Sequence, residues 1–224
     1  MDLELWADIC YYQNGGDAAN LRPVDFKKMR AAGVAGVCIR KSVGYYRDVA
    51  FDMNWDGAGF AGLKRTLYTV PYVGYDTQRQ LTAMTTVVRN GIVTPFVPRL
   101  DRPMWLDCER THTLGLQRAT NEVMWYLVKL AEWYGENPDI YTARYVWERY
   151  FSDKPGWVDG WRIVVANYGA GIPTLPKGWR TKADGTAVPA MQAWRGWQYS
   201  ADGNGQGKAL GCWSAAVDLS WQKV

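Results

Sequence analysis

The chain has 224 residues, of which 48% are hydrophobic and 21% charged, and 26 Lys and Arg against 22 Asp and Glu give a net charge of +4. Its 13 Trp, 14 Tyr and 5 Phe exclude a disordered chain, because such chains are poor in aromatic residues. The basic residues form no Lys/Arg run, so nucleic acid is not an expected partner. We also expect no membrane span, since no apolar run approaches the required length.

Eight segments are predicted to be short strands: Leu5–Ile9, Val34–Arg40, Thr66–Val73, Pro103–Asp107, Asp139–Tyr141, Arg162–Asn167, Met191–Gln198 and Ala215–Leu219. Several are nearly continuous apolar runs, as strands buried on both faces should be. Amphipathic stretches between the first five strands predict helices over Pro23–Ala32, from a cap at Asp76 to Gly91, and over Thr113–Tyr134.

The early strand ends follow one another at the spacing of about 30 residues that a strand and a crossover helix need. The later intervals are too short, or too rich in Gly and Pro, for full helices, and residues 168–189 are expected to form an irregular loop. We therefore predict an α/β fold, an irregular TIM-like (β/α) barrel of eight strands whose last three units are poor in helix. A doubly wound open sheet is the competing arrangement. No linker divides the chain, so residues 1–224 are expected to form a single domain.

Four cysteines stand far apart in the chain: Cys10, Cys38, Cys108 and Cys212. They lack the close spacing of a zinc cluster, and their apolar surroundings favour buried free thiols over two disulfides. The single histidine, His112, excludes a multi-histidine metal site and restricts a Ser-His-Asp site to that residue. We expect no metal and no cofactor, and carboxylates are the expected carriers of any chemistry.

Asp107 and Glu109 stand two residues apart at the end of a predicted strand, so both carboxylates point the same way. Asp8 and Asp218 lie at the ends of the first and last strands, which are neighbours when a barrel closes. Four acids are thus expected at the mouth of the barrel, where the active sites of such folds lie. A solvated pair of acids, or an Asp8 that only binds loop backbone, is the structural alternative.

Paired carboxyl groups can cleave a glycosidic bond without a metal ion or a histidine. One of the acids gives its proton to the leaving oxygen. The carboxyl group in the drier surroundings should have the raised pKa that this role requires. Aromatic side chains at strand ends are candidates for sugar contacts, and about half are expected to touch ligand: Tyr72, Tyr75, Tyr141, Tyr168, Trp197 and Tyr199.

The chain resembles the muramidases of glycoside hydrolase family 25. The matching segments occur in family order: Asp8–Gln13, Val24–Gly33 into Val37–Arg40, Asp48–Asn54, Trp105–Glu109, Ile140–Thr142, Val165–Gly169, Trp197–Ser200 and Val217–Ser220. Two segments depart from the family pattern. The third strand ends with Tyr72-Val-Gly-Tyr75 where relatives carry a Tyr-His-Phe type sequence, and Asn167 stands where a histidine or another polar residue is common.

The resemblance implies a lysozyme that hydrolyses the β-1,4 bond between N-acetylmuramic acid and N-acetylglucosamine in bacterial peptidoglycan. It implies Glu109 as the general acid with Asp107, Asp8 and Asp218 as the other catalytic acids. An enzyme nucleophile and the substrate's own 2-acetamido oxygen both remain open, and we favour acetamido assistance oriented by Asp107. The expected substrate contacts are Arg40, Tyr72, Tyr75, Tyr141, Asn167, Trp197 and Gln198.

Many relatives carry wall-binding repeats, whereas here only residues 220–224 follow the last predicted strand, so no separate wall-binding domain is expected. The acidic N-terminus does not read as a signal peptide, so we expect a mature secreted form or a phage protein that acts on the wall outside the cell. The alternatives are a catalytically silent glycan-binding or virion barrel and a chitin-type hydrolase. Four retained acids argue against the first, and the lack of a longer acidic motif argues against the second.

Overall fold

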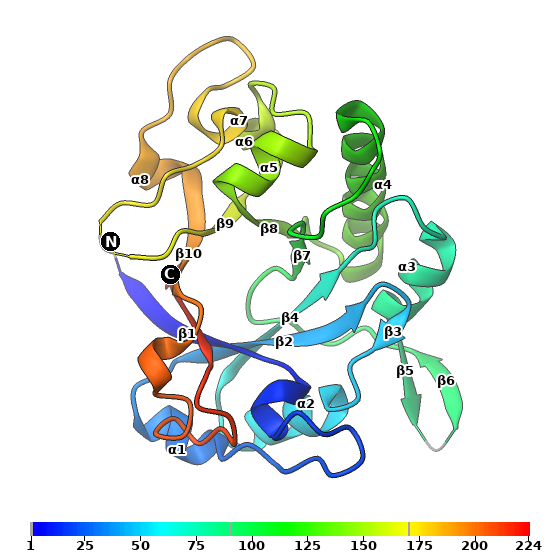
Figure 1. Cartoon of the computed structure of the whole chain (residues 1–224), viewed down its shortest axis with the longest axis vertical. Helices are drawn as coiled ribbons and strands as arrows, with labels where there is room; N and C mark the ends of the chain where they lie inside the picture. The colour runs from blue at the N-terminus through cyan, green and yellow to red at the C-terminus, as the bar shows by residue number, and fades with distance from the viewer. Residues whose placement is uncertain (1, 90, 170) are drawn as a thin grey trace.

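The computed structural model describes residues 2–89, 91–169 and 171–224. Its main sheet contains β1 (Leu3–Ile9), β2 (Gly36–Val43), β3 (Tyr46–Arg47), β4 (Lys64–Val70), β7 (Trp105–Asp107), β8 (Asp139–Ala143), β9 (Ile163–Ala166), β10 (Trp194–Ser200) and β11 (Asp218–Lys223). The strand order is β1-β11-β10-β9-β8-β7-β4-β2-β3, and β1 also pairs with β2. Eight strands of this described part therefore close into a barrel, with β3 added at the edge of β2 (Figure 1). The predicted barrel is confirmed.

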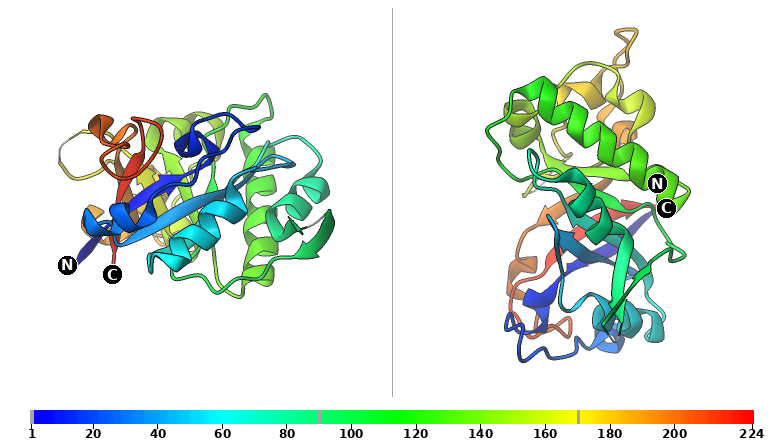
Figure 2. Two further views of the ribbon diagram at one scale, coloured as in Figure 1. Left: turned by 90° about the horizontal axis from the view of Figure 1, so that it is seen from below. Right: turned by 90° about the vertical axis from the view of Figure 1, so that its right-hand side faces the viewer.

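Helices cover the barrel unevenly. As far as residue 134, the helices are α1 (Phe26–Ala31), α2 (Phe51–Phe60), α3 (Thr77–Thr85) and α4 (Leu116–Tyr134). After residue 134, no described helix exceeds seven residues: α5 (Arg144–Tyr150), α6 (Trp157–Gly160), α7 (Lys177–Arg180) and α8 (Ala190–Ala193). Single 3-10 turns, η1 (Tyr11–Asn14) and η2 (Gly203–Gly205), follow β1 and β10. The two views of Figure 2 show the long α4 against one side of the barrel.

The helix boundaries follow local signals in the sequence. Asp25 caps α1 by accepting the N–H of Lys28 at 3.0 Å, and Asp76 caps α3 by accepting the N–H of Arg79 at 2.9 Å. Gly135, with φ of 78°, ends α4 in the left-handed conformation that glycine adopts without strain.

The eighth barrel strand differs from its prediction. It spans Asp218–Lys223 rather than Ala215–Leu219, so residues 220–223, which were expected to follow the last strand, form most of it. It also runs antiparallel to both β1 and β10. The reason is the connection after β10, which contains only the turn η2, because a parallel strand would need a crossover helix. The predicted pairing of the first and last strands is nevertheless confirmed, and Asp8 is the direct partner of Asp218.

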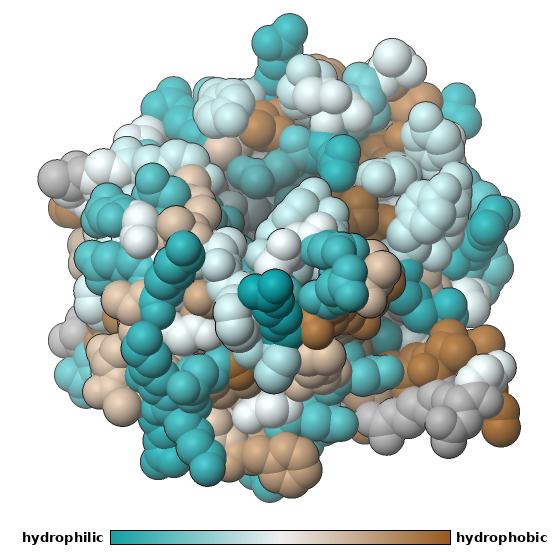
Figure 3. All heavy atoms as spheres, turned by 60° about the horizontal axis from the view of Figure 1, so that its bottom comes forward, coloured by the Kyte–Doolittle hydropathy of each residue, from teal (hydrophilic) through white to brown (hydrophobic). Residues whose placement is uncertain are grey.

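Two other predicted elements are wrong in part. The helix capped by Asp76 ends at Thr85 instead of Gly91, and a hairpin of β5 (Thr86–Arg89) and β6 (Ile92–Pro95) follows it. The β-branched run from Thr85 to Val88 favours this change. The hairpin exposes Ile92 and Val93, and a brown patch lies on its side of the molecule in Figure 3. In the predicted strand Met191–Gln198, the first residues belong to α8 and the strand begins at Trp194.

The core lies between the barrel and its helices, with a smaller cluster inside the barrel. That cluster includes Cys38 from β2, Trp105 from β7, Tyr141 from β8 and Val164 from β9. All four cysteines of the chain are free and buried, which confirms the prediction. Within the described ranges, no helix combines the length and apolar character needed to cross a membrane.

Candidate active site

The four predicted acids meet at one end of the barrel. Asp8 lies near the end of β1, Asp107 is the last residue of β7, and Glu109 follows two residues later. Asp218 is the first residue of β11, and because this strand runs antiparallel, its beginning lies at the same end. All four line one pocket together with Tyr68, Trp105, Tyr141 and Gln198.

Alternation along β7 places two of these side chains on the same face. Trp105 and Asp107 are two residues apart in the strand, so both point into the barrel. The ring of Trp105 stacks on Tyr141 of the neighbouring strand, with centroids 5.8 Å apart and planes inclined by 7°. Asp107 Oδ1 accepts the backbone N–H of Glu109 at 3.2 Å, which holds the segment that carries Glu109 close to the strand end. Packing and backbone geometry thus fix both carboxyl groups at the pocket.

Burial raises the pKa of Glu109 to about 7, while an interaction with the Tyr141 hydroxyl acts in the opposite direction. Burial also raises the pKa of Asp218 to about 7, and the charges of Glu109 and Asp202 add to this rise. A carboxyl group with such a pKa retains a proton near neutral pH, as a general acid must.

The other two acids are more deeply enclosed. Burial raises the pKa of Asp8 well above its usual range, and the charges of Asp218 and Asp107 raise it further. Burial likewise raises the pKa of Asp107, with repulsion from Glu109 as the next cause, while Arg110 and Arg40 oppose the rise. The four groups are close enough to disfavour simultaneous ionisation, so the pocket holds protons that free carboxyl groups would lose.

Gln198 connects three residues of the pocket. Its Nε2 donates to Asp8 Oδ2 at 2.6 Å, and its Oε1 accepts the hydroxyls of Tyr141 at 2.7 Å and Tyr168 at 3.0 Å. Ser220 Oγ makes a longer contact of 3.5 Å with the same oxygen of Asp8. Asp8 Oδ1 is buried and has no hydrogen-bond partner among the described residues. One oxygen of Asp8 therefore has hydrogen-bonding capacity that the described residues do not use.

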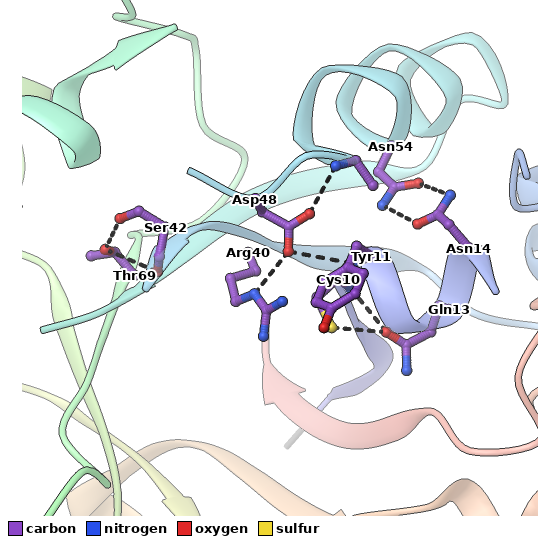
Figure 4. Close-up of polar contacts among 10 residues, drawn as sticks. Cys10, Tyr11, Gln13, Asn14, Arg40, Ser42, Asp48, Asn54 and Thr69 are labelled. Carbon is purple, nitrogen blue, oxygen red and sulfur yellow. Dashed lines mark hydrogen bonds and ion pairs between the residues drawn. The ribbon is translucent and has the colours of Figure 1, made fainter. Parts of the chain in front are cut away.

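Arg40 lies beside the pocket but does not line it. Its Nε donates to Asp48 Oδ2 at 2.8 Å, and the same oxygen accepts the N–H of Tyr11 (Figure 4). Asp48 Oδ1 accepts the N–H of Ala50 at 2.9 Å, so this buried carboxylate is well satisfied. The guanidinium of Arg40 also faces the rings of Tyr11 and Tyr12 at 5.3 and 5.6 Å. These contacts hold a positive charge near Asp107.

A second hollow adjoins the acidic pocket through Glu109. It is lined by Glu109, Ala143, Arg144, Tyr145, Glu148, Ala166, Asn167, Tyr168 and Thr174. Asn167 Oδ1 accepts the N–H of Thr174 at 3.1 Å, which orients this predicted contact residue at the wall. The two hollows form a continuous surface on either side of Glu109, which is the arrangement a polymer needs to place one bond beside this carboxyl group.

Besides Arg40, three predicted contact residues lie outside both hollows. Tyr72 is half-buried with the guanidinium of Arg110 at 5.2 Å from its ring, and Tyr75 is exposed and meets Tyr72 edge to face. Trp197 alternates with Gln198 along β10, so its indole lies on the other face, where Nε1 donates to the carbonyl of Asn167 at 2.7 Å. The structure therefore brings together the acids, Tyr141 and Gln198, with Asn167 in the adjoining hollow. It leaves Arg40, Tyr72, Tyr75 and Trp197 outside.

Several lining residues were missed by the sequence analysis. Tyr68 lies inside a predicted strand rather than at its end, and Trp105 precedes Asp107 by two residues. Counting alternate positions back from the acids would have found Trp105. Asp48, which holds Arg40, follows a turn and β3. It begins the family-like segment Asp48–Asn54, but no role was predicted for it.

A closed barrel with a proton-holding carboxyl group beside other carboxyl groups at its mouth defines a glycoside hydrolase. A family model described as Glycosyl hydrolases family 25 matches residues 8–208. The chain belongs to this family, which confirms the resemblance found in the sequence.

Solved structures with the same fold come from bacteria, fungi and phages. A bacterial lysozyme from Streptomyces coelicolor is 19% identical, with a TM-score of 0.73 over 99% of this chain and 92% of that one. A lysozyme from Aspergillus fumigatus is 20% identical, with a TM-score of 0.72 over 100% and 95% of the two chains. The catalytic domain of the endolysin ply40, from bacteriophage P40 of Listeria monocytogenes, is 17% identical, with a TM-score of 0.61 over 99% and 94%. No curated protein sequence matches significantly.

Proposed function

We propose that this chain is a peptidoglycan muramidase, a lysozyme that hydrolyses the β-1,4 bond between N-acetylmuramic acid and N-acetylglucosamine. The observation that carries the proposal is Glu109, a carboxyl group with a pKa of about 7 that lies between the acidic pocket and the adjoining hollow. Membership of glycosyl hydrolases family 25 supports it, as do the neighbouring structures described as lysozymes and muramidases.

In the proposed mechanism, Glu109 donates its proton to the oxygen that leaves the glycosidic bond. Asp107 is held beside Glu109 through the backbone N–H of Glu109, and its place in the pocket suits a group that orients the substrate's 2-acetamido oxygen for attack on the anomeric carbon. Asp8 and Asp218 face the same pocket. Asp218, with a pKa of about 7, is partly ionised at neutral pH, and its negative charge stabilises an oxocarbenium-like centre. The acetamido oxygen bonds to the anomeric carbon as the glycosidic bond breaks, so no covalent bond to the enzyme forms. A water molecule then gives a proton to the Glu109 carboxylate and opens this ring, which produces the new reducing end and restores the acid.

Substrate contacts in this proposal come from both hollows. Asn167 lines the hollow beyond Glu109, and Tyr141 presents an aromatic ring and a hydroxyl within the acidic pocket. Arg40, Tyr72, Tyr75 and Trp197 remain proposed contacts for sugar units or peptide stems farther along the polymer. Residues 1–224 are proposed to act as one catalytic domain on the wall outside the cell, in the manner of a secreted lysozyme or a phage endolysin.

The test is lysis of purified peptidoglycan, followed as a fall in turbidity. The wild-type chain should clear the suspension, and Glu109→Gln should lower the rate by about two to four orders of magnitude, the scale of a lost general acid. Glu132→Gln is a matched control, because Glu132 is exposed on α4 and forms a surface ion pair with Lys129. A chain that binds the wall but never clears it would instead be a silent glycan-binding barrel.

A further inference from the structure

A cluster of three cations lies at the end of the barrel opposite the acids. Arg162 directly precedes β9, Arg195 is the second residue of β10, and Lys223 ends the antiparallel β11, which Asp218 begins. Together the three cations line a hollow of about 320 Å³, which we call the basic hollow, and no described carboxyl group lines it. Its aromatic and amide walls come from Trp161, Trp194 and Gln192.

The two guanidinium groups are unpaired. Within residues 2–89, 91–169 and 171–224, neither Arg162 nor Arg195 donates a side-chain hydrogen bond or forms an ion pair. Lys223, in contrast, is held in place: its Nζ donates to the carbonyl oxygens of Met191, at 2.6 Å, and Trp194, and lies 4.0 Å from the centre of the Trp194 ring. Both arginines therefore keep their N–H groups for a ligand, beside an ammonium whose position is fixed.

The positive charges of the basic hollow are close enough to repel one another. Burial, together with the charge of Arg195, lowers the pKa of Lys223 to about 8. Burial also lowers the pKa of Arg195, and repulsion from Arg162 and Arg102 adds to this effect. An anion bound among these groups relieves the repulsion, because all of them attract it.

The carboxyl groups that act on this cluster lie outside the basic hollow. Glu136 and Asp139 oppose the fall in the pKa of Arg195, but they line a neighbouring hollow, which Arg162 also borders. Burial raises the pKa of Asp139 to about 7, so this group is only partly ionised near neutral pH. The lining of the basic hollow therefore carries a net positive charge.

The arrangement suits a single phosphate group. A guanidinium binds two oxygens of a phosphate at once, and two guanidinium groups with an ammonium match a group that has several charged oxygens. The half-buried ring of Trp161 and the exposed carboxamide of Gln192 suit the carbon chain and hydroxyl groups of a polyol or sugar. A nucleic acid would instead need cations spread along a stripe, whereas these cations converge on one small hollow.

We propose that the basic hollow binds a phosphate ester of a polyol or sugar, as found in the polyol-phosphate polymers of bacterial walls. Bound there, the polymer holds the chain to the wall through the end of the barrel that faces away from the acids, and the acidic pocket stays free for the glycan strand. The binding itself does not depend on the proposed function. Only the wall as the source of the phosphate ester rests on it.

The first experiment follows the indole N–H signals of ¹⁵N-labelled protein by NMR at low salt while glycerol 3-phosphate is added. The signals of Trp161 and Trp194, assigned by their loss in Trp161→Phe and Trp194→Phe, should shift until they saturate, and glycerol without phosphate should cause no shift. Arg162→Gln and Arg195→Gln should each raise the dissociation constant about tenfold, the scale of one lost charge-assisted hydrogen bond.

Arg118→Gln is the matched control, because Arg118 is exposed on α4 and does not line the basic hollow. It should leave the dissociation constant unchanged. Arg162 is exposed, so Arg162→Gln decides the test even if Arg195→Gln fails to fold. The absence of saturable shifts, or equal dissociation constants in the wild type and the arginine variants, would overturn the inference.

The second experiment tests the wall polymer as the source of the phosphate ester. Glu109→Gln protein, which should not digest the wall, is sedimented with purified walls before and after hydrofluoric acid removes their phosphate polymers. The removal should lower the bound fraction severalfold, and adding Arg162→Gln and Arg195→Gln should lower binding to intact walls to the same level. Equal binding to both kinds of wall, or no effect of the arginine substitutions, would refute the polymer as the ligand. Neither experiment requires cleavage, so a chain that binds phosphate esters but never releases wall fragments contradicts the proposed function alone.

Discussion

Glu109→Gln should stabilise the protein at alkaline pH while it removes activity. The pKa of Glu109 is about 7 in the folded chain, against an ordinary value of 4.5. The unfolded chain therefore loses this proton at lower pH than the folded chain, and the free energy of unfolding falls as the pH rises from 4.5 to about 7. The pKa difference of about 2.5 units between the folded and unfolded chains corresponds to a loss of about 3 kcal/mol in the free energy of unfolding. This loss is complete only above pH 7.

Glutamine cannot ionise, so the substitution removes this loss of stability at high pH. At pH 8 the variant should gain up to about 3 kcal/mol, or about 6 to 12 °C in melting temperature for a chain of this length. At pH 4 both side chains are neutral, and the melting temperatures should nearly coincide. Thermal unfolding followed by circular dichroism at both pH values measures the difference, with Glu132→Gln as the surface control. An equal gain at both pH values, or a loss at pH 8, would refute the buried-acid interpretation of Glu109.

Three further predictions concern cofactors, cysteines and packing. Wall lysis should be unaffected by EDTA, since no cluster of three metal-ligating side chains occurs among the described residues; activity lost to the chelator and restored by a divalent ion would contradict this. A reductant should leave the melting temperature unchanged, because all four cysteines are free, and a large fall would reveal disulfides. Gly36→Ala should lower the free energy of unfolding by about 1 to 3 kcal/mol, because the added Cβ would lie 2.6 Å from the ring of the buried Trp6. Gly160→Ala, which has open space around it, should have little effect. Equal denaturation midpoints for the two variants would disprove this packing argument.

The sequence was sufficient for the barrel and its acids because both depend on short-range patterns. Apolar runs at regular intervals predict the strands. An acid at the end of such a run is therefore expected at the mouth of the barrel. Asp8 and Asp218 could be paired across the whole chain only because closure makes the first and last strands neighbours. The direction of β11 was missed because an apolar strand pattern is the same in both directions.

The substrate contacts were harder to predict for a related reason. The end of a predicted strand indicates where a residue lies along the barrel axis. The face on which its side chain lies is harder to predict, because a shift of one residue along the strand reverses it. Trp197 and Gln198 are adjacent, yet only Gln198 points into the pocket. The roles of Gln198 and Tyr168 also depend on hydrogen bonds between strands far apart in the chain, which no local pattern encodes.

The proposed function requires the converging acids to cut one particular bond in peptidoglycan. Mass spectrometry of the fragments released from purified peptidoglycan identifies that bond. A muramidase leaves N-acetylmuramic acid at every new reducing end, and Glu109→Gln should release almost none of these fragments. Reducing-end N-acetylglucosamine, or anhydro products, would assign the chain to a different class of enzyme.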